Sequence, residues 1–270
     1  MGLKVTTESD DWVRDGGEME KLTRLSGLET GESRPLAESI LNSIKLPIAE
    51  HGFGGFWFQG VANSAYQDYM QNSRKSLLTR RVLRSRGGVL ASSPTVQLLH
   101  EQYVTRVAPT DINFAEALRL ESPYCYVLCE NGLPNKAKKL FNRHGVNTVL
   151  SWPLKHFASD AWSGRFTLLS KHPQGELNLT GLEATLKQAQ MSLFEHFHDE
   201  INPYRQNNLF NQTAIKALRM AATGLHNHEI SQELHITVRG VEYHLESMRN
   251  KLSATNRANL VHIAHQLEII

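Results

Sequence analysis

Charged side chains able to hydrogen-bond to nucleic acid recur at helical spacing close to the C-terminus. They fall on one side of a predicted helix that follows Thr237: Arg239, Glu242, Glu246 and Arg249. The other side carries an apolar stripe: Val241, Leu245, Met248 and Leu252. A helix that packs on one side and presents forked or planar polar groups on the other suits reading of the DNA major groove. A simple solvated helix face is the alternative interpretation of this pattern.

Short amphipathic segments on either side of this helix predict how it is positioned. Residues 213–265 are typical of three or four short helices joined by very short connections. Gly224 is expected to end the first helix, because glycine just past a helix end adopts the left-handed conformation without strain. Asn227 is the expected cap of the second helix and Thr237 of the third. The apolar stripe of the third helix is then free to pack on the two small helices.

The residues of these helices resemble the LuxR-type helix-turn-helix in type and in spacing. The resemblance runs through GLHNHEISQELHIT (224–237), VEYHL (241–245), KL (251–252) and NRA (256–258). Ser231 and Gly240 replace the family's usual alanine and threonine, and Glu242 and Glu246 stand where several members carry basic or neutral residues. These departures bear on the DNA sequence that is preferred and not on the fold.

The resemblance implies a surface that binds double-stranded DNA as a homodimer on a two-fold site. RNA polymerase would be a further partner of such a regulator. The expected DNA contacts combine the cap, the polar side of the third helix and the cations beyond it: Asn227, Thr237, Arg239, Glu242, Tyr243, Glu246, Arg249, Lys251 and Arg257.

Composition and charge limit the class of protein. The chain has 270 residues, 40% apolar and 21% charged, with a net charge of +2, which suits two modest globular domains. The near-neutral balance excludes a polycationic nucleic-acid coat, so DNA contact must come from a local patch. No apolar run approaches the ~18 residues of a membrane span, and the N-terminus lacks a signal-peptide core. We therefore expect a cytoplasmic protein with no membrane partner.

The order of helical and extended segments predicts an α+β chain. We expect an N-terminal α/β/α sandwich with a mostly antiparallel sheet, followed by an all-α helix-turn-helix domain of four helices. The expected divisions are a partly disordered extension at 1–34, a ligand-binding and dimerisation domain at 35–200, an asparagine-rich linker at 201–212 and the helix-turn-helix domain at 213–270.

The N-terminal part resembles, in patches, the autoinducer-binding domain of quorum-sensing LuxR-type regulators. The patches are YVTRVAPTD (103–111), SPYCY (122–126), GVNTVLSWPL (145–154) and GRFTLLS (164–170). The resemblance implies a pocket for an acyl-homoserine lactone, in which Tyr103, Asp111 and Thr167 match the family's tyrosine, aspartate and hydroxyl. Leu99 and Tyr126 stand where the family has tryptophans. These changes imply an atypical or solo receptor with a weak response to common lactones, and with a different small-molecule signal or none.

The pocket is expected between the sheet and the helices that carry Tyr103 and Asp111. Tyr126 and Trp152 would close it, and Phe56 and Phe58, which strand alternation sends to one face, would form its apolar wall. Asp111 has a second interpretation, because an aspartate at that place can cap the helix that follows and then needs no ligand. The function we expect is a ligand-responsive regulator. The alternatives are a regulator switched by a partner protein, and an interaction module that sequesters another regulator.

Other chemistry-bearing residues do not predict a site. His196 and His198 diverge on a helix, so no metal is expected there, and no cofactor either. Cys125 and Cys129 are too few for a disulfide framework or a zinc site, and read as buried thiols or as a thiol sensor. The cations of 74–86 form either a solvated helix face or a surface for phosphate or a partner. No recognised nucleophile motif occurs, so we expect no enzyme.

Overall fold

The structure is a computed structural model that describes residues 33–63, 88–130, 132–157, 160–205 and 210–270. The architecture below concerns the described part of Glu38–Ile270, one of the two units into which the chain divides, and the helix that leads into it. The basic stretch 74–86 and the extension up to residue 32 lie outside the described residues. The expected domain boundaries therefore stay a prediction.

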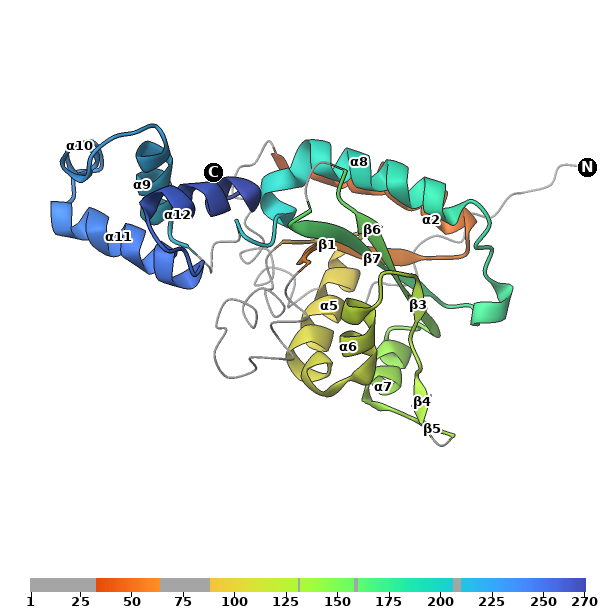
Figure 1. The fold of residues 1–270 in the computed structure, drawn as a ribbon. Helices are drawn as coiled ribbons and strands as arrows, with labels where there is room; N and C mark the ends of the chain where they lie inside the picture. Colours follow the sequence, from red (N-terminus) through yellow and green to blue (C-terminus); the bar gives the residue numbers. More distant parts are fainter. Residues whose placement is uncertain (1–32, 64–87, 131, 158–159, 206–209) are drawn as a thin grey trace, which may run out of the picture. The chain divides into compact units, whose positions relative to one another are not determined.

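Among the described residues, both helices and strands occur up to residue 201, and those from residue 210 onward form only helices (Figure 1). The first part contains, in chain order, α2 (Ser33–Glu50), β1 (Gly55–Ala62), β2 (Val89–Ala91), α5 (Pro94–Arg106), η1 (Ala108–Thr110), α6 (Ile112–Arg119), β3 (Tyr124–Cys125), β4 (Cys129–Glu130), β5 (Leu133–Pro134), α7 (Lys136–Arg143), β6 (Thr148–Lys155), β7 (Trp162–Ser170), η2 (Gln174–Glu176) and α8 (Leu182–Ile201). The second part contains α9 (Gln212–Ala222), α10 (Asn227–Glu233), α11 (Val238–Lys251) and α12 (Arg257–Gln266). No described helix is long and apolar enough to cross a membrane.

The larger sheet has five strands in the order β2-β1-β7-β6-β3. Every neighbouring pair is antiparallel. All but one residue of the central strand β7 are buried, because helices cover both faces of the sheet. The predicted α+β class is confirmed, with its mostly antiparallel sheet between helical layers and its C-terminal helical part.

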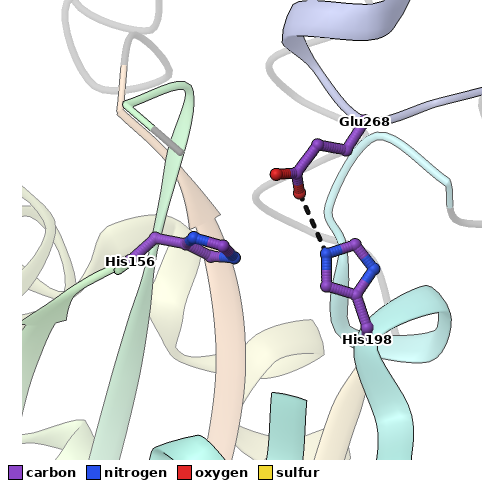
Figure 2. A group of neighbouring side chains, drawn as sticks. All are labelled: His156, His198 and Glu268. Atoms are coloured by element: carbon purple, nitrogen blue, oxygen red, sulfur yellow. Dashed lines mark hydrogen bonds and ion pairs between the residues drawn. The ribbon is translucent and has the colours of Figure 1, made fainter. Parts of the chain in front are cut away.

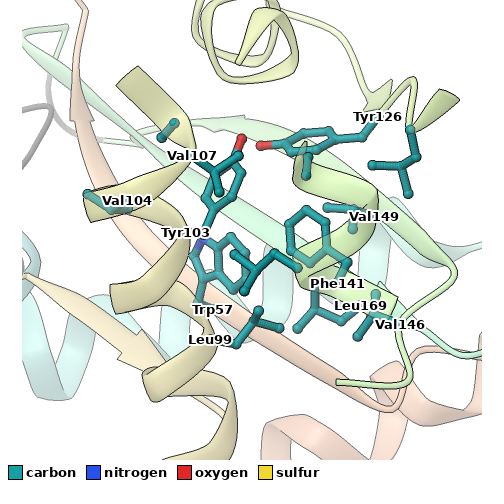
Figure 3. Packing of buried hydrophobic residues seen from close by; sticks show 14 of the residues in the cluster. Trp57, Leu99, Tyr103, Val104, Val107, Tyr126, Phe141, Val146, Val149 and Leu169 are labelled. Atoms are coloured by element: carbon teal, nitrogen blue, oxygen red, sulfur yellow. The ribbon is translucent and has the colours of Figure 1, made fainter. Parts of the chain in front are cut away.

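Strand register sorts the side chains between the two faces. Trp57 pairs with Thr167, and Ser151 pairs with Thr167 from the other side, so these three side chains share one face. Helices α5, α6 and α7 cover that face, and α8 covers the opposite one (Figure 1). The face toward α5 carries an aromatic cluster, in which the rings of Trp57, Tyr126 and Phe141 pack around that of Tyr103 (Figure 3).

The face toward α8 is packed closely enough that two strand positions require glycine. A Cβ at Gly60 would lie 2.2 Å from the backbone oxygen of Ile201, and one at Gly164 would lie 2.1 Å from Oε1 of Gln190. A side chain at Gly60 would clash with the backbone at the end of α8, whereas one at Gly164 would have to displace the Gln190 side chain and the Phe58 ring. The register places Phe58 opposite Phe166 on this face, and the Phe58 ring lies 5.9 Å from that of Phe194 on α8.

The C-terminal helices begin and end largely where local signals predict. Gly224 has a φ of 95° directly after α9, and Thr237 accepts a hydrogen bond from the Gly240 N–H at 3.0 Å, which confirms both expected boundaries. The cap of α10 is His226 and not Asn227, and the Glu229 carboxylate accepts from its N–H at 2.6 Å. The apolar stripe of α11 is buried as predicted: Val241, Leu245, Met248 and Leu252.

Candidate nucleic-acid interface and ligand cavity

The outward side of α11 carries a contiguous set of polar and aromatic side chains. Arg239, Glu242, Tyr243 and Glu246 are all exposed, while Val241 between them is fully buried. Tyr243 exposes 70% of its surface, which is unusual for an aromatic residue in a packed domain. This arrangement leaves one side of the helix free to enter a groove, as a DNA-reading helix requires.

Glu246 and Arg249 form an ion pair on this helix, with 2.6 Å between the carboxylate and the guanidinium. The hydrogen bond from Arg249 lowers the pKa of Glu246, and the same bond raises the pKa of Arg249. Arg249 also donates to the backbone oxygen of Thr255 at 3.2 Å, across the turn that leads to α12. Glu246 and Arg249 therefore each have a partner within the domain, and whether either of them contacts DNA stays a prediction.

Arg257 and Asn227 face the interior of the helical domain more than the solvent. Arg257 donates to the Asn227 side-chain oxygen at 3.0 Å and to the backbone oxygen of Leu225. These bonds tie the start of α12 to the connection before α10. In this structure they hold the helices together, and a phosphate contact of Arg257 stays a prediction.

The remaining expected contacts lie at the two ends of α11. The hydroxyl of Thr237 caps the helix, so the first backbone N–H groups of α11 point outward beside an exposed residue. Lys251, also exposed, places its ammonium 5.4 Å from the centre of the Phe210 ring. Whether any of these residues contacts DNA stays a prediction.

A small cavity lies on the sheet face covered by α5 and α6. Its wall combines aromatic rings with a few polar groups: Trp57, Gln59, His100, Tyr103, Val104, Phe114, Ala117, Leu118, Tyr126, Arg165 and Thr167. Its volume is about 10 Å³, roughly the room that one water molecule needs. A larger ligand must therefore displace some of these side chains.

The Asp111 carboxylate accepts hydrogen bonds from Tyr103 and from Asn113, and the bond from the Asn113 backbone makes it a helix cap. The Tyr103 hydroxyl donates to Asp111 at 2.8 Å, and the Asn113 backbone N–H and side-chain amide donate at 3.1 Å and 2.9 Å. Asp111 thus caps α6, the second of its two interpretations, and it is not part of the cavity wall. Burial is the main reason that the pKa of Tyr103 is raised well above its ordinary value, so this hydroxyl stays a donor.

Arg165 brings a buried positive charge into the cavity wall. Its exposed fraction is 6%, and burial lowers its pKa to about 10, so it remains charged at neutral pH. Its guanidinium donates to the Ser151 hydroxyl at 3.0 Å and to the Leu120 backbone oxygen at 3.3 Å. Its Nε–H has no partner, and no carboxylate pairs with it within the described residues. A buried cation in this state is costly unless an acceptor approaches it.

Besides Asp111, four of the expected ligand residues do not line the cavity. Phe56 and Phe58 face α8, and Trp152 shares that face through its register with Phe166. None of the three therefore lines this cavity, contrary to the expectation. Leu99 is buried in the core beside the cavity but is not part of its wall. Tyr103, Tyr126 and Thr167 do line it.

Several wall residues were missed at the level of sequence. Strand alternation does send Trp57 and Gln59 away from Phe58, but the pattern cannot say which face lies under α5 and α6. His100 shares a side of α5 with Tyr103 at helical spacing. Arg165 had no signal at all, because an arginine in a strand is usually exposed.

The described residues also contain one group with metal-ligating chemistry, formed by His156, His198 and Glu268 (Figure 2). His198 was expected on a solvated helix end, yet its Nε2 lies 2.9 Å from the Glu268 carboxylate. The two thiols differ from each other: Cys125 is half-buried, and Cys129 is exposed and not buried as expected.

Comparison with known proteins bears on the C-terminal helices. The family model described as "Bacterial regulatory proteins, luxR family" matches residues 212–264. A crystal structure of Escherichia coli SdiA has 18% identity and a TM-score of 0.41, with coverage of 93% of this chain and 96% of that one. A structure titled "SdiA in complex with octanoyl-rac-glycerol" has 16% identity and a TM-score of 0.41, with coverage of 92% and 93%. No curated protein matches the chain.

The family match coincides with the helices that the geometry singles out. It begins at the first residue of α9 and ends inside α12, so it includes the capped, outward-facing helix α11. Residues 212–264 are therefore a helix-turn-helix domain of the luxR family.

Proposed function

We propose that this protein is a transcriptional regulator that binds a two-fold operator in duplex DNA as a homodimer. The observation that carries the proposal is the exposed side of α11 within a luxR-family domain, where Arg239, Glu242 and Tyr243 stand together and free of the core. A helix of this kind reads base edges in the major groove, and a two-fold site follows when two copies bind side by side.

The test is selection of DNA sites by the purified protein, followed by measurement of affinity at several salt concentrations. Arg239→Ala should weaken binding to every sequence and lower the salt slope by about one unit, because one phosphate contact is lost. Lys187→Ala, which removes an exposed cation on α8, should leave both quantities unchanged. Failure to select any site, with the protein folded, would contradict the proposal.

We further propose that the N-terminal domain binds a small signal molecule at the cavity under α5 and α6. Supporting this is a wall of aromatic rings with converging polar groups from Tyr126, Thr167 and Arg165, a composition common to ligand sites. The uncompensated charge of Arg165 favours a ligand that carries an oxygen acceptor, ideally an anionic one. The altered tryptophan positions, Leu99 and Tyr126, argue against common acyl-homoserine lactones as that ligand.

An interaction module that sequesters another regulator is the second candidate. It is supported by the charges of the C-terminal part, where residues 209–270 carry six lysines and arginines against five carboxylates. Arg249 and Arg257 are moreover engaged within the domain. A mobility-shift assay with fragmented genomic DNA separates the candidates, because a module that binds only protein would shift no fragment at low salt.

A further inference from the structure

Three ligand-type side chains from distant parts of the chain converge beside the C-terminus. Each of His156, His198 and Glu268 offers one potential metal-ligand atom, and these three atoms all lie within 4.8 Å of one another. Figure 2 shows both imidazoles and the carboxylate pointing into the space between them. All three residues are half-buried, so the space is shielded on some sides and open on others.

Packing against aromatic rings fixes the His156 side chain. The ring of His156, just beyond β6, stacks on Phe157 at 5.1 Å and on Phe194 at 4.5 Å, and lies 4.5 Å from the ring of Trp162. Three aromatic contacts hold the imidazole in one orientation. Such restraint suits a metal ligand, because little side-chain freedom is left to lose on binding.

The other two residues, His198 and Glu268, lie at or beside irregular backbone. Phe197 interrupts the helical conformation of α8 with φ −132° and ψ 22°, immediately before His198. Glu268 adopts a positive φ of 56° just after α12. The Asn202 and Arg205 side chains donate to the backbone oxygen of Glu268, which anchors this residue beside the end of α8.

We propose that His156, His198 and Glu268 form a binding site for a divalent transition metal, with Zn²⁺ as its occupant. Two imidazoles and one carboxylate are a ligand set that zinc uses, with water in the fourth position. This ligand set favours zinc over Mg²⁺ and Ca²⁺, because those two ions prefer all-oxygen ligands. In a tetrahedral site the ligand atoms lie about 3.3 Å apart, so the widest separation here must close by about 1.5 Å. Rotation of the Glu268 side chain can supply such a movement.

Outer contacts of the kind that orient metal ligands are already present. The Asp199 carboxylate lies 3.4 Å from Nδ1 of His198, on the far side of the ring from Glu268. The Trp162 indole donates to Glu268 at 2.9 Å. A carboxylate behind a ligating histidine fixes its tautomer and raises its basicity. A metal at this point would join β6, α8 and the chain end that follows α12.

The experiment is a titration of metal-free, tag-free full-length protein with Zn²⁺ in competition with a chromophoric chelator. Wild-type protein should bind one equivalent of Zn²⁺. The variants His156→Phe, His198→Ala and Glu268→Gln should each lose well over about tenfold in zinc affinity, and Asp199→Asn should lose about tenfold, the low end for an outer partner. Phenylalanine keeps the aromatic stacking, and glutamine keeps an acceptor for the Trp162 indole. Loss of binding in these two variants therefore reports ligation and not misfolding.

His196→Ala is the matched control, because His196 is exposed on the same helix and its ring bonds to the backbone oxygen of Ser192. This variant should bind zinc like wild type. Co²⁺ in place of zinc should give the intense visible absorption of a four-coordinate site in wild type and in His196→Ala only. Equal zinc affinity in wild type and His198→Ala, an equal loss in His196→Ala, or no stoichiometric binding would each overturn the proposal.

Discussion

At the scale of single residues, the charge of Arg165 is the clearest constraint on what the cavity accepts. The guanidinium is buried, faces aromatic rings and lacks a carboxylate partner within the described residues. Moving such a group out of water is repaid only by hydrogen bonds and by opposite charge. A ligand oxyanion would supply both, whereas the neutral head of a lactone would supply only acceptors.

A matched pair of small probes tests this. Benzoate and benzamide have nearly the same size and shape, and only benzoate is charged. We expect benzoate to raise the thermal midpoint of the wild-type protein more than benzamide does, and Arg165→Gln to remove the difference. At a hundredfold excess over Kd, the stabilisation is about 2.7 kcal/mol. Equal shifts by both probes, or a benzoate shift that survives Arg165→Gln, would contradict an anion-binding role.

His100 makes a residue-scale contribution to stability that depends on pH. Burial lowers its pKa to about 4, while the unfolded chain keeps the ordinary value of 6.5. Between these values the unfolded state binds the extra proton, so stability falls as pH drops from 6.5 toward 4. The full loss is about 3 kcal/mol, from 1.36 kcal/mol per unit of pKa.

We expect His100→Phe to reduce this acid sensitivity. Phenylalanine keeps the ring that meets Trp57 at 5.2 Å, and it cannot take up a proton. Urea unfolding at pH 7 and pH 5 measures the effect, with His196→Ala as a control on an exposed histidine. The same drop in stability in His100→Phe as in wild type would assign the acid sensitivity to other groups.

A comparison of Arg257 with Arg239 distinguishes a structural arginine from one that contacts DNA. Because it bonds to Asn227 and to the backbone of Leu225, Arg257→Ala should destabilise the helical domain by about 1–3 kcal/mol. At temperatures where the variant is folded, the salt slope of DNA binding should match wild type. Arg239→Ala should show the opposite pattern, with unchanged unfolding and a reduced slope, so unfolding curves and salt titrations together decide the matter.

At the scale of elements, α11 carries two glutamates in different situations. Glu246 is paired with Arg249, whereas Glu242 is exposed on the same side of the helix beside Arg239 and Tyr243. A carboxylate in the major groove can accept from cytosine N4. A carboxylate that is already bonded to a neighbouring arginine contributes mainly to ordering that arginine.

Glu242→Ala should therefore change base preference more than Glu246→Ala does. We expect a change of about 1–3 kcal/mol at one base pair of each half-site for Glu242→Ala. Glu246→Ala should act more through Arg249, and so more evenly over sequences. Site selection with both variants measures this, and an identical preferred site for Glu242→Ala and wild type would exclude base reading by Glu242.

At the scale of the whole molecule, a two-fold operator sets the geometry that two copies must satisfy. Half-sites one helical turn apart, about 10–10.5 bp, present the same groove to both copies of α11. Inserting about 5 bp between the half-sites turns one of them to the far side of the duplex. We expect this insertion to abolish tight binding and sedimentation of the intact complex to show two chains per site. Unchanged affinity after the insertion would favour independent monomers.

Local pattern determined much of this protein from sequence alone. The buried stripe of α11, the Thr237 cap and the Gly224 boundary depend on residues within a turn or two of each other, so spacing and propensity suffice. The separation of Trp57 from Phe58 follows likewise from the period of a strand.

Only the tertiary structure decided which neighbour each face of a strand or helix packs against. Alternation could not say that α5 and α6 cover the Trp57 face, so Phe56 and Phe58 were assigned to the wrong wall. Asp111 had two possible roles from sequence, and its bond from the Asn113 backbone N–H shows that it caps α6. His198 meets Glu268 across 70 residues of chain, and no local spacing records such a pairing, because chain folding alone brings the two together.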